Sequence, residues 1–436
     1  MTPESLQAFE SWMDDHLEPA SSEFGRYWYP LTVPTFGRDE IAAAMNCLVN
    51  YQTSMGAMTR EFEKQFAQYV GCHDAVMVNS GSSADLLLAY NLVNPSNPRL
   101  SAGDEVLVPA VTWPTQIWSP LMAGLKVTLV DVDPATLNVD FDDMRRRLTS
   151  KTKCVFAVHL MGNPIDMKLM KEFCDEHELL LIEDCCESLD AKFDDKHVGN
   201  FGLGGSFSFF FSHHMTTMEG GMVTCHNEED ADALRVLRAH GWSRGLKTPA
   251  AKNQVGLGST ASGPTVVDDR YRFVNWGFNL RPTELQAAFG LEQLKKLDGM
   301  NDRRRELANR FATYADSQSW FECFDTPASG VASPFALPML LKGDAVGSRA
   351  ELLDYLEQAG VETRPVVTGN FARQPAAKLL GDVDPKDFPG AEWIHEQGFY
   401  LGLSPMMDDL KLERLTRTLD EAHAAVVRRT HIRKVA

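Results

Sequence analysis

The sequence lacks the features that would place the protein in a membrane or on nucleic acid. No run of about 18 apolar residues occurs in its 436 residues, which argues against a membrane span. The amino-terminal stretch MTPESLQAFESWMDDHLEP has neither a basic nor an apolar region, so we expect no signal peptide. Basic residues are scarce, with 42 Lys and Arg against 60 Asp and Glu, and the net charge of −18 repels phosphate backbones and anionic lipids. We therefore expect no nucleic-acid or membrane partner.

Cysteine pairs at metal-binding spacing are also absent. The eight cysteines, at positions 47, 72, 154, 174, 185, 186, 225 and 323, form no CxxC pair. This spacing indicates neither a zinc site nor an iron–sulfur site, and we expect reduced thiols in a cytoplasmic enzyme. The chain is 44% hydrophobic and 23% charged, which is typical of a globular enzyme. Its length favours one large α/β domain and a smaller one.

Helix and strand patterns alternate between about residues 60 and 240. Short apolar strands separated by helices predict a mostly parallel sheet that helices cover on both faces. The expected strands are 74–78, 105–109, 126–132, 154–160 and 179–183, and the expected helices are 58–69, 82–92, 141–148 and 167–177.

The pattern changes further along the chain. We expect an amino-terminal helical segment (1–50), a large domain (51–305) and a smaller carboxy-terminal α+β domain (306–436). Within the large domain, residues 245–269 are rich in Gly, Ser, Thr, Pro and Ala and predict a long loop or insertion. The later expected elements are helices at 282–297 and 349–358 and strands at 320–324, 335–341 and 361–366.

Two segments join a strand end to polar residues. In NSGSSADLLLAY (79–90), Gly81, Ser82 and Ser83 stand at a helix start, whose free N–H groups and positive dipole end favour a phosphate. An ordinary helix cap is the alternative. In LLLIEDCCES (179–188), Asp184 ends an apolar strand, where α/β sheets bind ligands. It is a candidate partner for a protonated ring nitrogen, and a solvated strand end is the alternative.

Four further side chains are candidates for binding roles. Trp113, just past another strand, is suited to stack on a flat cofactor or to fill the core. Arg281 is suited to pair with a phosphate or carboxylate, although most arginines are surface residues. The pair His213 and His214 suggests a metal, but no Cys or acidic ligand stands at a suitable spacing, so we expect no metal.

Together and in this order, these segments resemble the DegT/DnrJ/EryC1/StrS family of sugar aminotransferases that use pyridoxal 5′-phosphate (PLP). The resemblance covers about residues 30–430. It implies a PLP-dependent transferase of fold type I, aspartate-aminotransferase-like, with a mostly parallel seven-stranded sheet. It also implies a homodimer with shared active sites. By position, the implied cofactor-binding residues are Gly81, Ser82 and Ser208 at the phosphate, Trp113 on the ring, Asp184 at the pyridinium nitrogen, Glu187 near the 3-hydroxyl and Asn279 at the neighbouring subunit's phosphate.

One departure from the family changes the implied chemistry. Family aminotransferases carry their Schiff-base lysine in a segment like SFYPTKNLTTGEGG, whereas this chain reads SFFFSHHMTTMEGG (208–221). His213 therefore occupies the lysine position. An imidazole cannot bind the cofactor covalently, but its ordinary pKa of about 6.5 suits a general base.

Members with His at this place resemble nucleotide-sugar 3-dehydratases. The segments RAHGWSRGL (238–246), GFNLRPTE (277–284) and RPVVTGNF (364–371) bring the chain nearest the GDP-4-keto-6-deoxy-D-mannose 3-dehydratase subgroup. The related CDP-sugar enzyme carries a cysteine-bound [2Fe–2S] cluster in the segment after the histidine. Residues 226–322 contain no cysteine here, so we expect no iron–sulfur cluster.

The resemblance implies that glutamate converts PLP to pyridoxamine 5′-phosphate (PMP), which condenses with the 4-keto group of the sugar. His213 would then move the proton as the C3 hydroxyl leaves, and a 4-keto-3,6-dideoxy sugar and ammonia would be released. We expect His240, Arg244 and Arg281 to bind the glutamate carboxylates or the substrate phosphates. A plain aminotransferase and an inactive cofactor-binding paralogue remain the alternatives.

Overall fold

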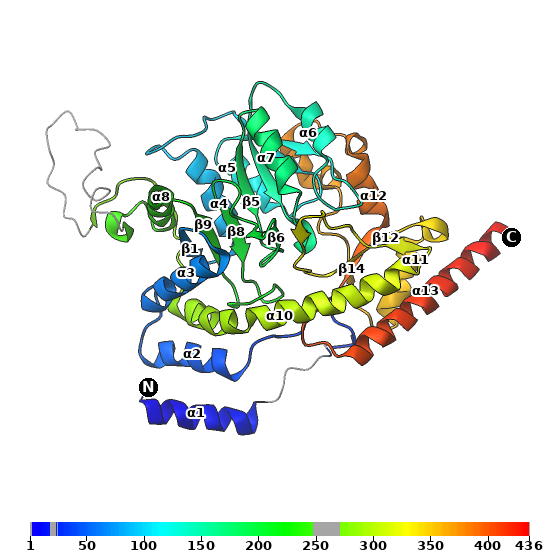
Figure 1. Ribbon diagram of the computed structural model, residues 1–436, viewed down its shortest axis with the longest axis horizontal. Helices are drawn as coiled ribbons and strands as arrows, with labels where there is room; N and C mark the ends of the chain where they lie inside the picture. The colour runs from blue at the N-terminus through cyan, green and yellow to red at the C-terminus, as the bar shows by residue number, and fades with distance from the viewer. Residues whose placement is uncertain (1, 18–22, 24, 247–270, 436) are drawn as a thin grey trace.

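The computed structural model describes residues 2–17, 23, 25–246 and 271–435 (Figure 1). The expected insertion at 245–269 therefore lies, beyond its first two residues, outside the described residues. Among the helices of the described part, none is both long enough and apolar enough to cross a membrane.

A seven-stranded sheet lies at the centre, in the order β1-β9-β8-β5-β4-β2-β3. β2 pairs in parallel with β3 and β4, β4 with β5, and β5 with β8, whereas β9 is antiparallel to β1 and β8. The expected mostly parallel seven-stranded sheet is thus confirmed. Its strands are β1 (Asp74–Val78), β2 (Glu105–Pro109), β3 (Lys126–Val130), β4 (Thr152–Val158), β5 (Leu180–Asp184), β8 (Gly205–Ser208) and β9 (Gly221–Cys225).

Both faces of this sheet are covered, because its strands are apolar on both sides. In β1 the side chains of Val76 and Val78 enter one core cluster, while Ala75 and Met77 enter another on the opposite face. This alternation follows from the period of two along a strand. The surrounding helices are α3 (Ala57–Val70), α4 (Gly81–Leu92), α5 (Thr115–Met122), α6 (Phe141–Arg147), α7 (Met167–Glu176) and α8 (Glu228–Arg238) (Figure 1).

A second, four-stranded sheet forms in the carboxy-terminal part, in the order β10-β12-β14-β13, and is antiparallel throughout. A small sheet of order β11-β6-β7 joins the two parts, since β11 follows β10 in the chain while β6 and β7 follow β5. The elements are β6 (Lys192–Phe193), β7 (Lys196–His197), β10 (Phe321–Glu322), β11 (Gly330–Val331), β12 (Leu337–Leu341), β13 (Thr363–Arg364), β14 (Gly398–Leu401), α11 (Arg349–Gln358), α12 (Pro389–Gln397) and α13 (Asp409–Val435).

The helix α10 (Glu284–Asp316) runs continuously from the large sheet to the smaller one (Figure 1). Thr283 begins it with a capping box, in which its hydroxyl accepts from the Gln286 N–H and the Gln286 side chain accepts from the Thr283 N–H. α10 crosses the expected boundary at residues 305/306, and the domain limits remain a prediction.

The amino-terminal part contains two helices, α1 (Pro3–His16) and α2 (Arg38–Val49). α2 packs along α10. Between the helices, Trp28 and Tyr29 enter the core of the carboxy-terminal part, and Tyr29 forms a β-bridge with Val361. The described part of the first 50 residues thus packs against both α10 and the carboxy-terminal part.

Candidate active site

A cavity of about 550 Å³ opens at the carboxyl ends of the central strands. It gathers seven of the residues that the sequence singled out, from four separate stretches of the chain. These residues are Gly81, Ser82, Trp113, Asp184, Glu187, Ser208 and His213.

The start of α4 forms a tight polar wall of the cavity. The Ser80 side chain caps the helix by accepting from the Ser83 N–H at 3.1 Å. A Cβ on Gly81 would lie 2.5 Å from the Ser208 Cβ, so only glycine fits there. The Ser83 hydroxyl donates to Asn79 Oδ1 at 2.6 Å, and Ser83 does not line the cavity. The free N–H groups of this helix start, with Ser82 and Ser208, can therefore hold a phosphate.

Trp113 stands at the entrance, between β2 and α5. Its side chain is exposed (57%), which separates it from the core tryptophans such as Trp320 (2%). An indole left uncovered on a cavity wall can stack on a planar ring.

Asp184 at the end of β5 shares its surroundings with a second buried carboxylate, Asp85. Gln116 donates to both from the same amide nitrogen, and carboxylate oxygens of the two acids lie within 4.8 Å of each other. Thr115 and Ser206 hydroxyls donate to Asp85 at 2.7 and 2.5 Å. Burial and the neighbouring charge raise the pKa of Asp85 well above its ordinary value, and burial raises the pKa of Asp184. The larger rise at Asp85 favours a protonated Asp85 beside an ionised Asp184, and therefore a single negative charge at the cavity floor.

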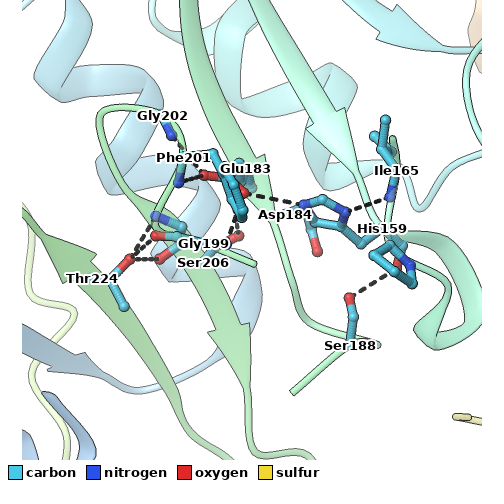
Figure 2. A network of polar contacts seen from close by, with 12 residues as sticks. His159, Ile165, Glu183, Asp184, Ser188, Gly199, Phe201, Gly202, Ser206 and Thr224 are labelled. Atoms are coloured by element: carbon cyan, nitrogen blue, oxygen red, sulfur yellow. Dashed lines mark hydrogen bonds and ion pairs between the residues drawn. The ribbon is translucent and has the colours of Figure 1, made fainter. Parts of the chain in front are cut away.

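A second buried pair, His159 and Glu183, lies at the end of β5 (Figure 2). The Ile165 N–H donates to His159 Nδ1 at 3.1 Å, so the other ring nitrogen carries the proton and donates to Glu183 Oε2 at 3.2 Å. Glu183 also accepts from the N–H groups of Gly199, Phe201 and Gly202. Burial raises the pKa of Glu183, but the His159 and backbone hydrogen bonds outweigh it, and the net pKa is lowered.

His213 lies in the turn between β8 and β9. Its Nδ1 is 2.6 Å from the backbone oxygen of Cys186. Because a carbonyl only accepts, Nδ1 carries the proton, and Nε2 is the basic atom of the neutral ring. Burial lowers the pKa of His213 to about 4, so the imidazole is neutral near pH 7. The ring packs edge-on against Phe335, with centroids 5.1 Å apart.

His214 points elsewhere. Its Nε2 donates to the Ser333 backbone oxygen at 2.9 Å, and the side chain is fully buried. The two adjacent histidines thus bind different carbonyl groups, and His214 fastens the turn to the segment before β12.

Glu187 completes the wall beside His213. One of its oxygens accepts from the Met161 N–H at 2.9 Å. Burial raises the pKa of Glu187 to about 7, with a smaller contribution from the charge of Asp184. The cavity therefore holds a neutral imidazole next to a carboxyl group that is partly protonated near pH 7, an arrangement suited to proton transfer.

The remaining expected binding residues lie outside this cavity. Asn279, Arg244 and Arg281 line a separate cavity of about 640 Å³ near the start of α10. His240 is exposed and lines neither cavity. Within one chain, the structure does not bring these four residues to His213.

Several residues of the cavity escaped the sequence analysis. Asp85 interrupts an otherwise apolar helix run, and Thr115 and Gln116 directly follow the Trp113 segment, so local signals existed for these three. Arg364 opens the segment RPVVTGNF, which carried the resemblance without being assigned to the site, whereas His159, Phe335 and Tyr400 arrive from other segments and carried no such signal. None of the described residues that line the cavity is a lysine. Lys192 and Lys196 lie in the small sheet, in β6 and β7.

Comparison with known proteins identifies the family to which the chain belongs. Residues 34–420 match the model of the DegT/DnrJ/EryC1/StrS aminotransferase family. The GDP-4-keto-6-deoxy-D-mannose 3-dehydratase of Yersinia pseudotuberculosis is 37% identical over 375 residues, which are 86% of this chain and 93% of the relative.

Solved structures of 3-dehydratases share the fold of this chain. A GDP-4-keto-6-deoxymannose 3-dehydratase with a trapped PLP–glutamate geminal diamine superposes with a TM-score of 0.82 at 34% identity, over 90% of this chain and 100% of that one. A histidine mutant of such an enzyme with bound GDP-perosamine gives 0.82 at 35% identity, with the same coverage. The expected fold type I is confirmed.

Proposed function

Since the chain belongs to the DegT/DnrJ/EryC1/StrS aminotransferase family, we propose that it is a PLP-dependent nucleotide-sugar 3-dehydratase. One observation carries the proposal. A neutral histidine with a free Nε2, His213, stands in the cavity, and none of the described lining residues is a lysine. Such a site can move protons but cannot hold the cofactor covalently as an aminotransferase does.

The cavity fits PLP or PMP. The tight glycine at position 81 and the α4 N-terminus suit the phosphate, and the exposed ring of Trp113 suits stacking. Asp184 offers a carboxylate to the pyridinium nitrogen. Glu187 accepts one backbone N–H with one oxygen, and its other oxygen would be the partner for the 3-hydroxyl. When bound, the cofactor supplies the amino group and an electron sink for breaking the sugar's C3–oxygen bond.

The side chains then have distinct tasks. Asp184 would hold its negative charge against the ring nitrogen, while Gln116, which also donates to Asp85, donates to Asp184 and keeps its orientation. His213 would accept at Nε2 the proton lost from the amino-bearing carbon of the cofactor and would deliver it to the C3 hydroxyl, which leaves as water, while Nδ1 stays anchored to Cys186. Because burial lowers the pKa of His213 to about 4, its protonated form is a stronger acid than an ordinary imidazolium and releases the proton more readily.

The substrate follows from the relatives. We infer that the chain removes the C3 hydroxyl of GDP-4-keto-6-deoxy-D-mannose, with glutamate as amino donor, and releases ammonia and a 4-keto-3,6-dideoxy sugar. Two observations support this inference: 37% identity to a 3-dehydratase of that substrate, and related structures with GDP-perosamine or a PLP–glutamate adduct. A cytoplasmic location fits the nucleotide-sugar substrate.

We also propose a homodimer with shared active sites. Asn279, Arg244 and Arg281 line a cavity that lacks His213, yet they are an amide and two cations suited to phosphates or carboxylates. Asn279 is exposed, and its side chain accepts from Arg281 Nε at 2.9 Å. Placed across a two-fold interface, this group would complete the site of the partner subunit. His240 lies four residues before Arg244 in the chain.

A spectral experiment tests the proposal. Glutamate added to the PLP-loaded protein should bleach the PLP absorbance band and raise the shorter-wavelength PMP band, as amino transfer without a lysine requires. An inactive cofactor-binding paralogue would show no change with glutamate. Absence of the change in protein that retains PLP on gel filtration would sink the dehydratase proposal.

A further inference from the structure

Arg304 of α10 is buried and contacts the backbone of His213. The residue is 2% exposed. Its guanidinium donates to the backbone oxygens of Phe335 and Leu403, and Nη2 donates to the His213 oxygen at 3.3 Å. Nε has no hydrogen-bond partner among the described residues. Arg304 thus joins three segments: the turn that carries His213, the approach to β12 and the end of β14.

The charge of Arg304 has no neutralising partner in the described part of the chain. All its acceptors are neutral carbonyl groups, whereas other buried arginines, such as Arg235 and Arg238, bind carboxylates at 2.5 and 2.6 Å. Burial lowers the pKa of Arg304 to about 10, which still leaves it charged at neutral pH. A buried charge without a counter-ion is unfavourable, so three carbonyl contacts alone are a weak reason to place an arginine there.

We propose that Arg304 is a positioning residue for His213: it fixes the histidine backbone and places a permanent positive charge behind the imidazole. If Arg304 only connected the three segments by hydrogen bonds, N–H donors without a charge would be sufficient. The charge matters because it disfavours a second positive charge on the ring. It lowers the pKa of both His213 and His214, in addition to the larger effect of burial.

The other charged or titratable groups near the imidazole come from several elements. They are Asp184 at the end of β5, Cys186 and Glu187 after it, Asp85 in α4, His159 after β4, Glu219 before β9, Arg364 in β13, Tyr400 in β14 and the adjacent His214. Arg304, in contrast to these groups, contacts the backbone of His213 directly. In the proposed reaction, on which this inference rests for the role of His213, the arginine ensures that a proton taken at Nε2 does not stay there.

Histidine NMR of the full-length chain, labelled at ring Cε1, tests the inference without the reaction. The His213 signal is assigned by its loss in His213→Gln. Arg304→Gln keeps planar N–H donors without the charge and should raise the pKa of His213 by about one unit. Arg304→Lys keeps the charge and should leave the pKa near the wild-type value. The acidic limb of the kcat/KM profile should move with the NMR midpoint.

Two outcomes would overturn the inference: an unchanged midpoint in Arg304→Gln, or the same rise in Arg304→Lys. The wild-type protein gives a check that needs no variant. Its His213 should remain neutral down to about pH 4, and a midpoint near 6.5 contradicts the inference even if Arg304→Gln does not fold. These results concern the ring alone, so they are separate from failure of the glutamate experiment.

Discussion

His213 Nδ1 donates to the backbone oxygen of Cys186, 2.6 Å away and two residues beyond Asp184. The end of β5 therefore orients both the proposed base and the proposed partner of the cofactor nitrogen. Because the carbonyl group fixes the tautomer, Nε2 is the basic atom whichever ligand enters. The position of Nε2 relative to Asp184 is thus set by one strand end and one turn.

His213→Lys should restore a covalent link to PLP and abolish dehydration. A lysine amine can condense with the cofactor aldehyde, whereas it cannot replace an imidazole held by a backbone carbonyl. We expect dehydration to fall by about 10²–10⁴-fold. Mass spectrometry after borohydride reduction should find the cofactor on residue 213. His213→Gln is the control without an amine, and persistent dehydration in either variant would show that His213 is not the base.

Asp184 and Asp85 should respond differently to removal of charge. Asp184→Asn removes the carboxylate that faces the ring nitrogen and should weaken PLP binding by about 3 kcal/mol, measured by equilibrium dialysis. Asp85→Asn replaces the acid expected to be protonated, so PLP affinity should change by less than about 1 kcal/mol. Equal losses in the two variants would mean that both acids are ionised.

Glu187 should make stability depend on pH. Its folded pKa is about 7, against 4.5 for the ordinary value. Between these values the unfolded chain releases the proton while the folded chain keeps it. The free energy of unfolding should therefore fall as pH rises from 4.5 to about 7, by up to about 3 kcal/mol.

Urea unfolding of the protein and of Glu187→Gln checks this. Gln has no such proton, so the variant should gain stability relative to the wild type above pH 7 and not below pH 4.5. A difference between the two proteins that is constant with pH speaks against the raised pKa.

Mixed dimers should reveal whether active sites are shared. His213→Gln and Asn279→Ala homodimers should each lose activity, since each site lacks one necessary group. A dimer with one subunit of each kind contains one site with both defects and one intact site. Activity should therefore reappear after co-expression and purification by two tags, whereas sites built within one chain would stay inactive.

The sequence predicts β1 and β2 with the bounds that the structure shows, because five-residue apolar runs between turn residues have few alternatives. The strand expected at 361–366 forms over Thr363–Arg364 alone. Its pairing with β14 depends on partners 36 and 38 residues away in the chain, and local pattern cannot supply that contact.

The candidate site divides in the same way. Gly81, Asp184 and His213 stand at strand–helix junctions or turns whose composition marks them. The anchor on Cys186 and the buried Arg304 depend on three-dimensional contacts, because the partners are 27 and 91 residues away from His213. The separation of Asn279 from His213 also appears only in the fold.

The most direct test is the identity of the product. The PLP-loaded protein should be incubated with glutamate and GDP-4-keto-6-deoxy-D-mannose, and the sugar product and ammonia followed by mass spectrometry and an ammonia assay. We predict a 3-deoxy-4-keto sugar with ammonia released in equal amount. A 4-amino sugar that keeps its C3 hydroxyl, formed without ammonia, would contradict this prediction and identify an aminotransferase.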